Sequence, residues 1–195
     1  MDLEAFHPSA KSCGAPVIGF IKHLLPVYGP DTLIDAFARV LAVRPDSRLW
    51  MVGAGPMEYE LKQRALRHGI AESIQWLGAV PHQDIPALLA QMTVTVMPSR
   101  SEAFGIAALE SQAMEVPVVA TNVGGIPESV ADGETGILTP PNDSETLGCA
   151  ILKLLNDEGL RRQLGENGRR RVESLFNWRE TVDRTISYYH EACSG

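Results

Sequence analysis

The sequence predicts an α/β domain of the doubly wound, Rossmann-like kind, with about six parallel strands, helices on both faces and a helical C-terminal tail. Short apolar runs alternate along the chain with longer segments whose apolar residues recur at helical spacing. The connections between them are short, and strands joined through helices in this way lie parallel. A length of 195 residues suits one such domain with a substantial core.

The expected strands are short runs bounded by turn residues. The run "VPVVAT" is continuous and rich in β-branched residues, which is typical of a strand buried on both faces. The six runs lie at 16–21, 48–53, 73–78, 93–98, 116–121 and 136–139.

The expected helices lie between and after these runs. The segment 31–43 has apolar residues at helical spacing, with Asp31 as its expected N-cap. The segment 56–69 starts at a proline and ends at a glycine, as helices often do. Further helices are expected at 85–91, at 105–114, from Pro127, and at 144–156, 158–175 and 178–192.

Composition narrows the class of protein. A formal net charge of −7 argues against a nucleic-acid partner, and the arginines at 169–171 are interpreted as the solvated face of a late helix. The three cysteines, Cys13, Cys149 and Cys193, match no metal-ligand spacing and are typical of a reducing cytosol. The sequence contains no apolar run of the roughly eighteen residues that a membrane span needs. We therefore expect a cytoplasmic protein.

Ligands of open α/β sheets bind beyond the carboxyl ends of the strands, so the loops there are the candidate site. They are 22–29, 53–58, 98–105 and 121–128, and the last three lead into helices whose N-termini suit a phosphate. The loop "GAGPME" partly matches a dinucleotide fingerprint, with Glu72 lying 19 residues beyond its first glycine. Because Glu58 replaces the third glycine, a simple tight turn is the competing interpretation.

The stretch "PSRSEAFGIAALE" places Glu102 before a glycine-opened helix and Glu110 within it. If the helix starts at Gly105, the N–H groups of residues 104–106 point at an anion. A carboxylate repels a phosphate but accepts hydrogen bonds from sugar hydroxyls, so both acids suit a diphosphate that carries sugars. Alternatively, Glu102 is a solvated loop acid and Glu110 a salt-bridged helix residue.

Four stretches carry a resemblance to a known family: "PSRSEAFGIAALESQAMEVPVVATNVGGIPESVADGETGILTPPND", "VGAGPME", "IQWLGAV" and "LGENGRRRVESLFNW". The first looks like the signature region of the retaining family 4 (group 1) glycosyltransferases, and the others are similar to its flanking segments, so the chain resembles this family from about Leu3 to Trp178. The resemblance implies the C-terminal, donor-binding half of a GT-B enzyme. It implies that residues 1–14 are a remnant of the interdomain connection, 15–177 the donor domain and 178–195 a C-terminal helix.

The resemblance also implies roles for individual residues. Glu102 matches the glutamate associated with the donor sugar, and Glu110 matches the one associated with the ribose hydroxyls. The other matching positions are Phe104, Gly105 and Ile106 for the diphosphate, Gly53 and Gly55 at the donor cleft, Leu77, Gly78 and Val80 for the nucleobase, and Gly124 and Gly125 near the sugar.

The departures from the family pattern concern charge. The family usually has two basic residues after the first strand, whereas "IKHLLPVYG" keeps Lys22, has His23 at the first position and Val27 at the second. Lys22 is then the expected catalytic cation, with His23 as a candidate donor-binding residue. Glu115 stands where the family tends to have glycine, and would be strained by about 1 kcal/mol in a left-handed conformation. The other histidines are expected to be surface or partly packed groups, although His82 lies close to the expected nucleobase pocket, and Trp50 and Trp76 are expected in the core.

The resemblance implies transfer of a hexose from a nucleoside diphosphate sugar with retention of configuration. The sequence contains no D-x-D pair, which favours metal-independent transfer without a cofactor. The resemblance implies that the N-terminal acceptor domain is missing from this sequence, so we expect donor binding without transfer, and we expect any peripheral membrane association to come through that domain. Two alternatives stay open: a nucleotide-sugar binding module without transfer activity, and a GT-B sugar-nucleotide epimerase or hydrolase.

Overall fold

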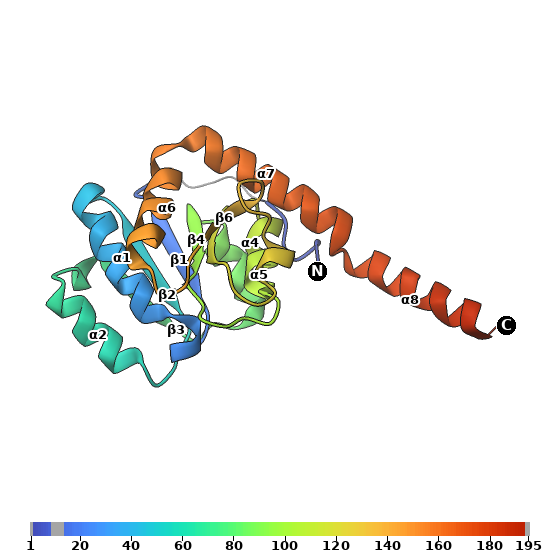
Figure 1. Ribbon diagram of the computed structural model, residues 1–195, viewed down its shortest axis with the longest axis horizontal. Coiled ribbons are helices and arrows are strands. Elements are labelled where there is room, and N and C mark those ends of the chain that lie inside the picture. Colours follow the sequence, from blue (N-terminus) through green and yellow to red (C-terminus); the bar gives the residue numbers. More distant parts are fainter. Residues whose placement is uncertain (1, 9–13, 194–195) are drawn as a thin grey trace.

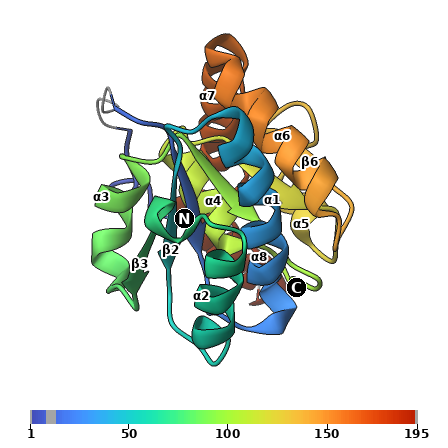
Figure 2. The same ribbon diagram turned by 90° about the vertical axis from the view of Figure 1, so that its left-hand side faces the viewer.

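A computed structural model describes residues 2–8 and 14–193, apart from the side chains of residues 178–181, 183 and 184. All six expected strands are present and form one parallel sheet (Figures 1 and 2). The order across the sheet is β3-β2-β1-β4-β5-β6, so the winding reverses between β1 and β4. The strands are β1 (Val17–Ile21), β2 (Arg48–Val52), β3 (Ile74–Gly78), β4 (Val94–Met97), β5 (Val118–Thr121) and β6 (Gly136–Thr139).

The helices follow the predicted pattern with small shifts at their ends. They are α1 (Pro30–Val43), α2 (Glu58–Arg67), α3 (Ile85–Leu89), α4 (Ile106–Ala113), α5 (Ile126–Ser129), α6 (Ser144–Asn156), α7 (Glu158–Leu175) and α8 (Trp178–Cys193). One detail of the prediction is wrong: Gly29, not Asp31, is the N-cap of α1. Asp31 lies in the first turn, where its carboxylate is used by Arg100 instead.

The alternation of side chains along the strands divides the core between the two faces of the sheet. Ile18 and Phe20 of β1 are buried beneath α1, α2 and α6, whereas Val17 and Ile21 face the side covered by α3 and α4. Helices α1 and α6 pack side by side on the first face (Figure 2). Trp50 and Trp76 are only half-buried and pack at the margins of these two cores.

Two of the three consecutive arginines do not form a solvated face, which corrects that prediction. Arg169 donates to the backbone oxygens of Phe6 and Ala113 at 2.6 and 2.8 Å, and Arg171 donates to the backbone oxygen of Glu128 at 2.9 Å. Guanidinium groups therefore fasten α7 to the body of the domain. Residues 2–8 take part in this packing, because Phe6 is only 2% exposed.

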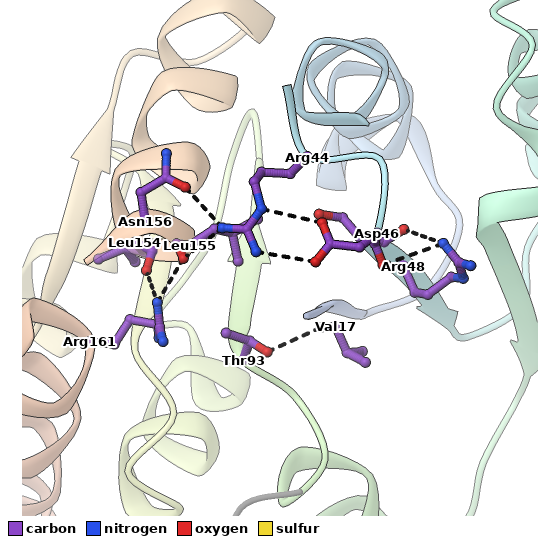
Figure 3. A network of polar contacts seen from close by, with 10 residues as sticks. Val17, Arg44, Asp46, Arg48, Thr93, Leu154, Leu155, Asn156 and Arg161 are labelled. Atoms are coloured by element: carbon purple, nitrogen blue, oxygen red, sulfur yellow. Dashed lines mark hydrogen bonds and ion pairs between the residues drawn. The ribbon is translucent and has the colours of Figure 1, made fainter. Parts of the chain in front are cut away.

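A polar network lies at the edge of the sheet where the strands have their amino ends, around the junction of α6 and α7 (Figure 3). Arg44 donates to Leu155 O at 3.2 Å and to Asn156 Oδ1 at 2.9 Å, while Asp46 accepts from the same guanidinium. Arg161 donates to Leu154 O and Leu155 O at 2.6 and 2.9 Å. These cations satisfy the last carbonyls of α6, where the helix dipole is negative.

Glu115 ends the turn after α4 with φ 56°, so its backbone is left-handed. A glutamate in this conformation costs about 1 kcal/mol relative to glycine.

Helix α8 extends away from the body of the domain (Figure 1). Ile186, Tyr188 and Tyr189 on this helix are exposed. Of the described helices, none is both long and apolar enough to cross a membrane. Cys149 and Cys193 are free and exposed, while Cys13 lies outside the described residues.

Candidate functional site

The candidate site begins where β1 and β4 part, at the switch point of the sheet. Lys22 follows β1 directly, and Glu102 lies on the loop that follows β4. Lys22 Nζ lies 2.9 Å from Glu102 Oε2, with side chains that are 22% and 9% exposed. The ammonium also lies 4.8 Å from the ring centroid of Tyr28. Parallel strands bring their carboxyl ends to one edge, which is why residues far apart in sequence meet here.

Glu102 keeps hydrogen-bonding capacity despite this ion pair. Its Oε2 atom is buried, and the contact with Lys22 lacks the geometry of a hydrogen bond, so among the described residues this oxygen has no hydrogen-bond donor. Because Oε2 is buried against the Lys22 ammonium, a ligand hydroxyl would bind to the other carboxylate oxygen, Oε1, which keeps acceptor capacity of its own. The interpretation of Glu102 as a solvated loop acid is therefore wrong.

Helix α4 presents a bare N-terminus beside Glu102. It begins at Ile106, after Gly105 as N-cap with φ 83° and ψ 52°, and no side chain caps it. Its first turn contains no acidic residue. Only a glycine adopts this backbone without strain, and the helix dipole adds partial positive charge at the same point.

Glu110 lies one turn further along α4 and is only 7% exposed. Its Oε1 atom lies 2.7 Å from His82 Nε2. His82 opens the short 3-10 helix η3 (His82–Asp84) that follows β3, and its side chain is 72% exposed. The two glutamates are therefore held by different cationic or donor groups, Lys22 and His82, on either side of the α4 N-terminus.

An apolar hollow of about 380 Å³ adjoins Glu110. Ile106, Leu109 and Glu110 line it from one face of α4, as helical spacing requires. Phe104 lies edge-on to Phe176, with ring centroids 5.6 Å apart. The remaining lining residues are Asp2, Phe6, His82 and Leu175. Of the predicted site residues, this hollow collects Phe104, Ile106 and Glu110 but neither Lys22 nor Glu102.

The glycines at the strand ends allow loops to press together. A Cβ at Gly124 or Gly125 would collide with the backbone oxygens of Glu102 and Ala103, and Gly125 N donates to Glu102 O at 3.1 Å. Gly53 and Gly55 similarly pack against the backbone of Lys22 and Leu24. The loops after β2 and β5 thus brace the loops that carry Lys22 and Glu102.

Arg100 is a residue that the sequence interpretation missed. It donates to Asp31 Oδ1 and Oδ2 at 2.9 and 2.7 Å, to Asn142 Oδ1 at 2.6 Å and to Pro26 O. Burial of Asp31 opposes its ionisation, but the hydrogen bonds and charge of Arg100 outweigh this and hold the pKa of Asp31 below its usual value. Arg100 therefore clamps the β4 loop to the start of α1.

The other residues that the sequence predicted for the site lie at the same edge of the sheet, where the strands have their carboxyl ends. Leu77 and Val80 are partly buried against the second face of the sheet, and Gly78 between them has φ 66° and open space around it. His23 is exposed, and Val27 is 39% exposed. The signal that could have singled out His82 is its place four residues after β3, at this same edge.

The described residues contain no cluster of three or more His, Cys, Asp or Glu side chains arranged as a metal site would need.

Comparison with known proteins adds the family. Residues 3–171 match the family described as glycosyl transferases group 1. The chain belongs to the group 1 glycosyltransferases. The parallel sheet with helices on both faces is the Rossmann-like fold of the GT-B glycosyltransferases that it resembles structurally.

Among relatives, the chain is 36% identical over 170 residues to the GDP-mannose-dependent monoacylated alpha-(1-6)-phosphatidylinositol monomannoside mannosyltransferase of Corynebacterium glutamicum, covering 84% of this chain and 44% of that one. Sucrose-phosphate synthase of Thermosynechococcus elongatus superposes with a TM-score of 0.90 at 28% identity, over 100% of this chain and 51% of that one. HepE of Anabaena, solved with UDP and glucose, gives 0.85 at 25% identity, over 98% and 55%. The chain thus spans about half the length of these group 1 glycosyltransferase relatives.

Proposed function

We propose that this chain binds the nucleoside diphosphate sugar of a retaining, metal-independent hexosyltransferase. The observation that carries the proposal is the Lys22–Glu102 pair at the switch point, beside the uncapped N-terminus of α4. A cation, a carboxylate with unused capacity and free backbone N–H groups are the complement of a diphosphate joined to a sugar. The solved complex of HepE with UDP and glucose supports this ligand class.

Each group then has a defined task. The backbone donors around Gly105 and Ile106 and the Lys22 ammonium stabilise the diphosphate as its bond to the sugar breaks. Glu102 accepts hydrogen bonds from sugar hydroxyls and orients Lys22 through their ion pair. Glu110, one turn away from the phosphate site, accepts from the ribose hydroxyls, where its charge does not face the diphosphate.

A second candidate function is a nucleotide-sugar binding module without transfer activity. His23 and Val27, at the two positions where the family pattern has permanent cations, supply no permanent charge. Within residues 22–29, Lys22 then supplies the permanent positive charge by itself. One such charge is more readily enough to bind a diphosphate than to stabilise it as a leaving group.

Calorimetry of the chain against UDP, GDP, ADP and their common sugar conjugates tests the proposal. We expect selective binding of one nucleotide, weakened about tenfold or more in Glu110→Ala, because hydrogen bonds to a charged group contribute about 1.5–3 kcal/mol. Glu60→Ala, on exposed α2 surface, is the matched control. Failure to bind any of these nucleotides would contradict the proposal.

We further expect the 195-residue chain to transfer no sugar, since its relatives are about twice as long. Measurable transfer by the purified chain would overturn that part.

A further inference from the structure

We infer that His82 is a positioning residue for ribose recognition, acting by fixing the carboxylate of Glu110. The inference rests on the proposed function, which gives Glu110 the ribose hydroxyls as its ligands. What it adds is a second residue, on a different element, that decides how that carboxylate is presented.

The Glu110 carboxylate needs an orienting partner. It is buried on α4, and Leu109, Phe104 and Phe176 line the same hollow. A charge in such surroundings is costly unless it is paired and hydrogen-bonded. His82, which follows β3, supplies this bond: its Nε2 atom lies 2.7 Å from Glu110 Oε1. The bond therefore joins the segment after β3 to helix α4, between residues 28 positions apart in sequence.

The imidazole is itself held in place. The ring of Phe6 lies 5.5 Å from that of His82, tilted by 50°, and Phe6 is almost fully buried. Arg169 holds Phe6 in turn, by donating a hydrogen bond to the backbone oxygen of Phe6. The outer face of the imidazole remains open to solvent, so the ring keeps most of its hydration while it donates to the carboxylate.

The bond to His82 and a bound ribose are compatible. A carboxylate offers about four acceptor positions on its two oxygens, and His82 uses one on Oε1. The positions that remain suffice for a vicinal diol. Because the bond from His82 fixes Oε1, the Glu110 carboxylate has already lost its rotational freedom before a ligand binds. Oε2 is then available to the ligand without that cost, and this preorganisation increases affinity.

Two matched variants test the inference. Glutamine places its side-chain N–H near the position of a histidine Nε2, whereas asparagine is too short to reach. We expect His82→Asn to weaken binding of UDP, GDP or ADP, whichever the chain binds, by about tenfold, as the loss of a hydrogen bond to a charged group predicts. His82→Gln should retain most of the affinity. His68→Gln is the control, because it alters an exposed histidine that is also paired to a carboxylate, Asp35, at 2.9 Å.

The 2′,3′-dideoxy nucleoside diphosphates separate positioning from a merely structural role. They lack the hydroxyls that Glu110 would accept, so wild type and His82→Asn should bind them equally. Three results for His82→Asn would each overturn the inference. The variant could weaken binding of the ribose and dideoxy ligands equally, leave the affinity for the ribose nucleotide unchanged, or bind that nucleotide more tightly. If the wild type binds a nucleotide and the variants bind it equally well, this inference alone fails. If the wild type binds none, the proposed function and this inference fail together.

The ligand-free chain offers an independent check. In alkaline buffer, nitrogen-15 shifts should place the neutral ring proton of His82 on Nε2, since that atom donates to Glu110. A proton on Nδ1 would contradict the geometry from which the inference starts. Thermal unfolding of each His82 variant checks that a substitution at this exposed position leaves the fold intact.

Discussion

Within the segment 22–29 that follows β1, Lys22 is the one lysine or arginine. It is shared between Glu102 and the face of Tyr28, so it is oriented before any ligand arrives. Val27, at the end of the same loop, has an exposed side chain, while its backbone oxygen accepts from Arg100 N at 2.7 Å. The backbone at this position is therefore fixed, and its side chain is free to change.

We expect Val27→Lys to tighten nucleoside diphosphate binding by about two- to fivefold, since exposed charge pairs contribute about 0.2–1 kcal/mol. Calorimetry at low and high salt measures it, and the gain should shrink at high salt. Val43→Lys, at the exposed far end of α1, introduces the same charge away from the site. If both variants behave alike, the missing cation has no role here.

At the scale of elements, the β4 loop is held from three sides. Arg100 ties it to α1, Thr121 Oγ1 donates to Ser99 O at 2.5 Å, and Gly125 N donates to Glu102 O. These bonds come from α1, from β5 and from the loop that follows β5. The loop that carries Glu102 is therefore positioned before ligand binding, which is what a site that recognises a flexible diphosphate requires.

The pKa of Asp31 makes this clamp sensitive to acid. Because it lies below the ordinary value of 3.8, ionised Asp31 contributes stability above that pH and loses it as pH falls through the folded-state value. We expect Asp31→Asn to lower the melting temperature by about 2–4 °C at neutral pH, equivalent to about 1 kcal/mol. The difference from wild type should close below about pH 3.8. A difference that is constant from neutral to acid pH would rule out the clamp as its source, and Asp84→Asn, on exposed η3, is the control.

At the scale of the whole molecule, the packed body and α8 are distinct. The buried apolar residues that the structure describes extend along the chain to Val172, and α8 extends outward from the body. Among the side chains that the structure describes, the buried core on both faces of the sheet is formed without a contribution from α8.

A chain that ends at residue 177 should keep the melting temperature of the whole chain to within about 3 °C, because regions with few buried contacts contribute little to global stability. Thermal unfolding followed by circular dichroism measures it. A chain that ends at residue 163 lacks Leu164 and Val172, both fully buried, and should fail to fold. Comparable destabilisation by both truncations would show that α8 belongs to the cooperative unit.

The amino-acid sequence by itself determined the elements of this protein and the edge at which its site lies. Apolar periodicity is local, so six strands and the helices between them could be predicted within a few residues, as could the glycine that opens α4. The same local logic failed for Asp31, Arg169 and Arg171, whose partners are distant in sequence. Only the tertiary structure decided that Glu102 meets Lys22 while Glu110 meets His82. Such pairs depend on how the parallel sheet brings the carboxyl ends of its strands, and the segments that follow them, together in space, and no local pattern in the chain records that.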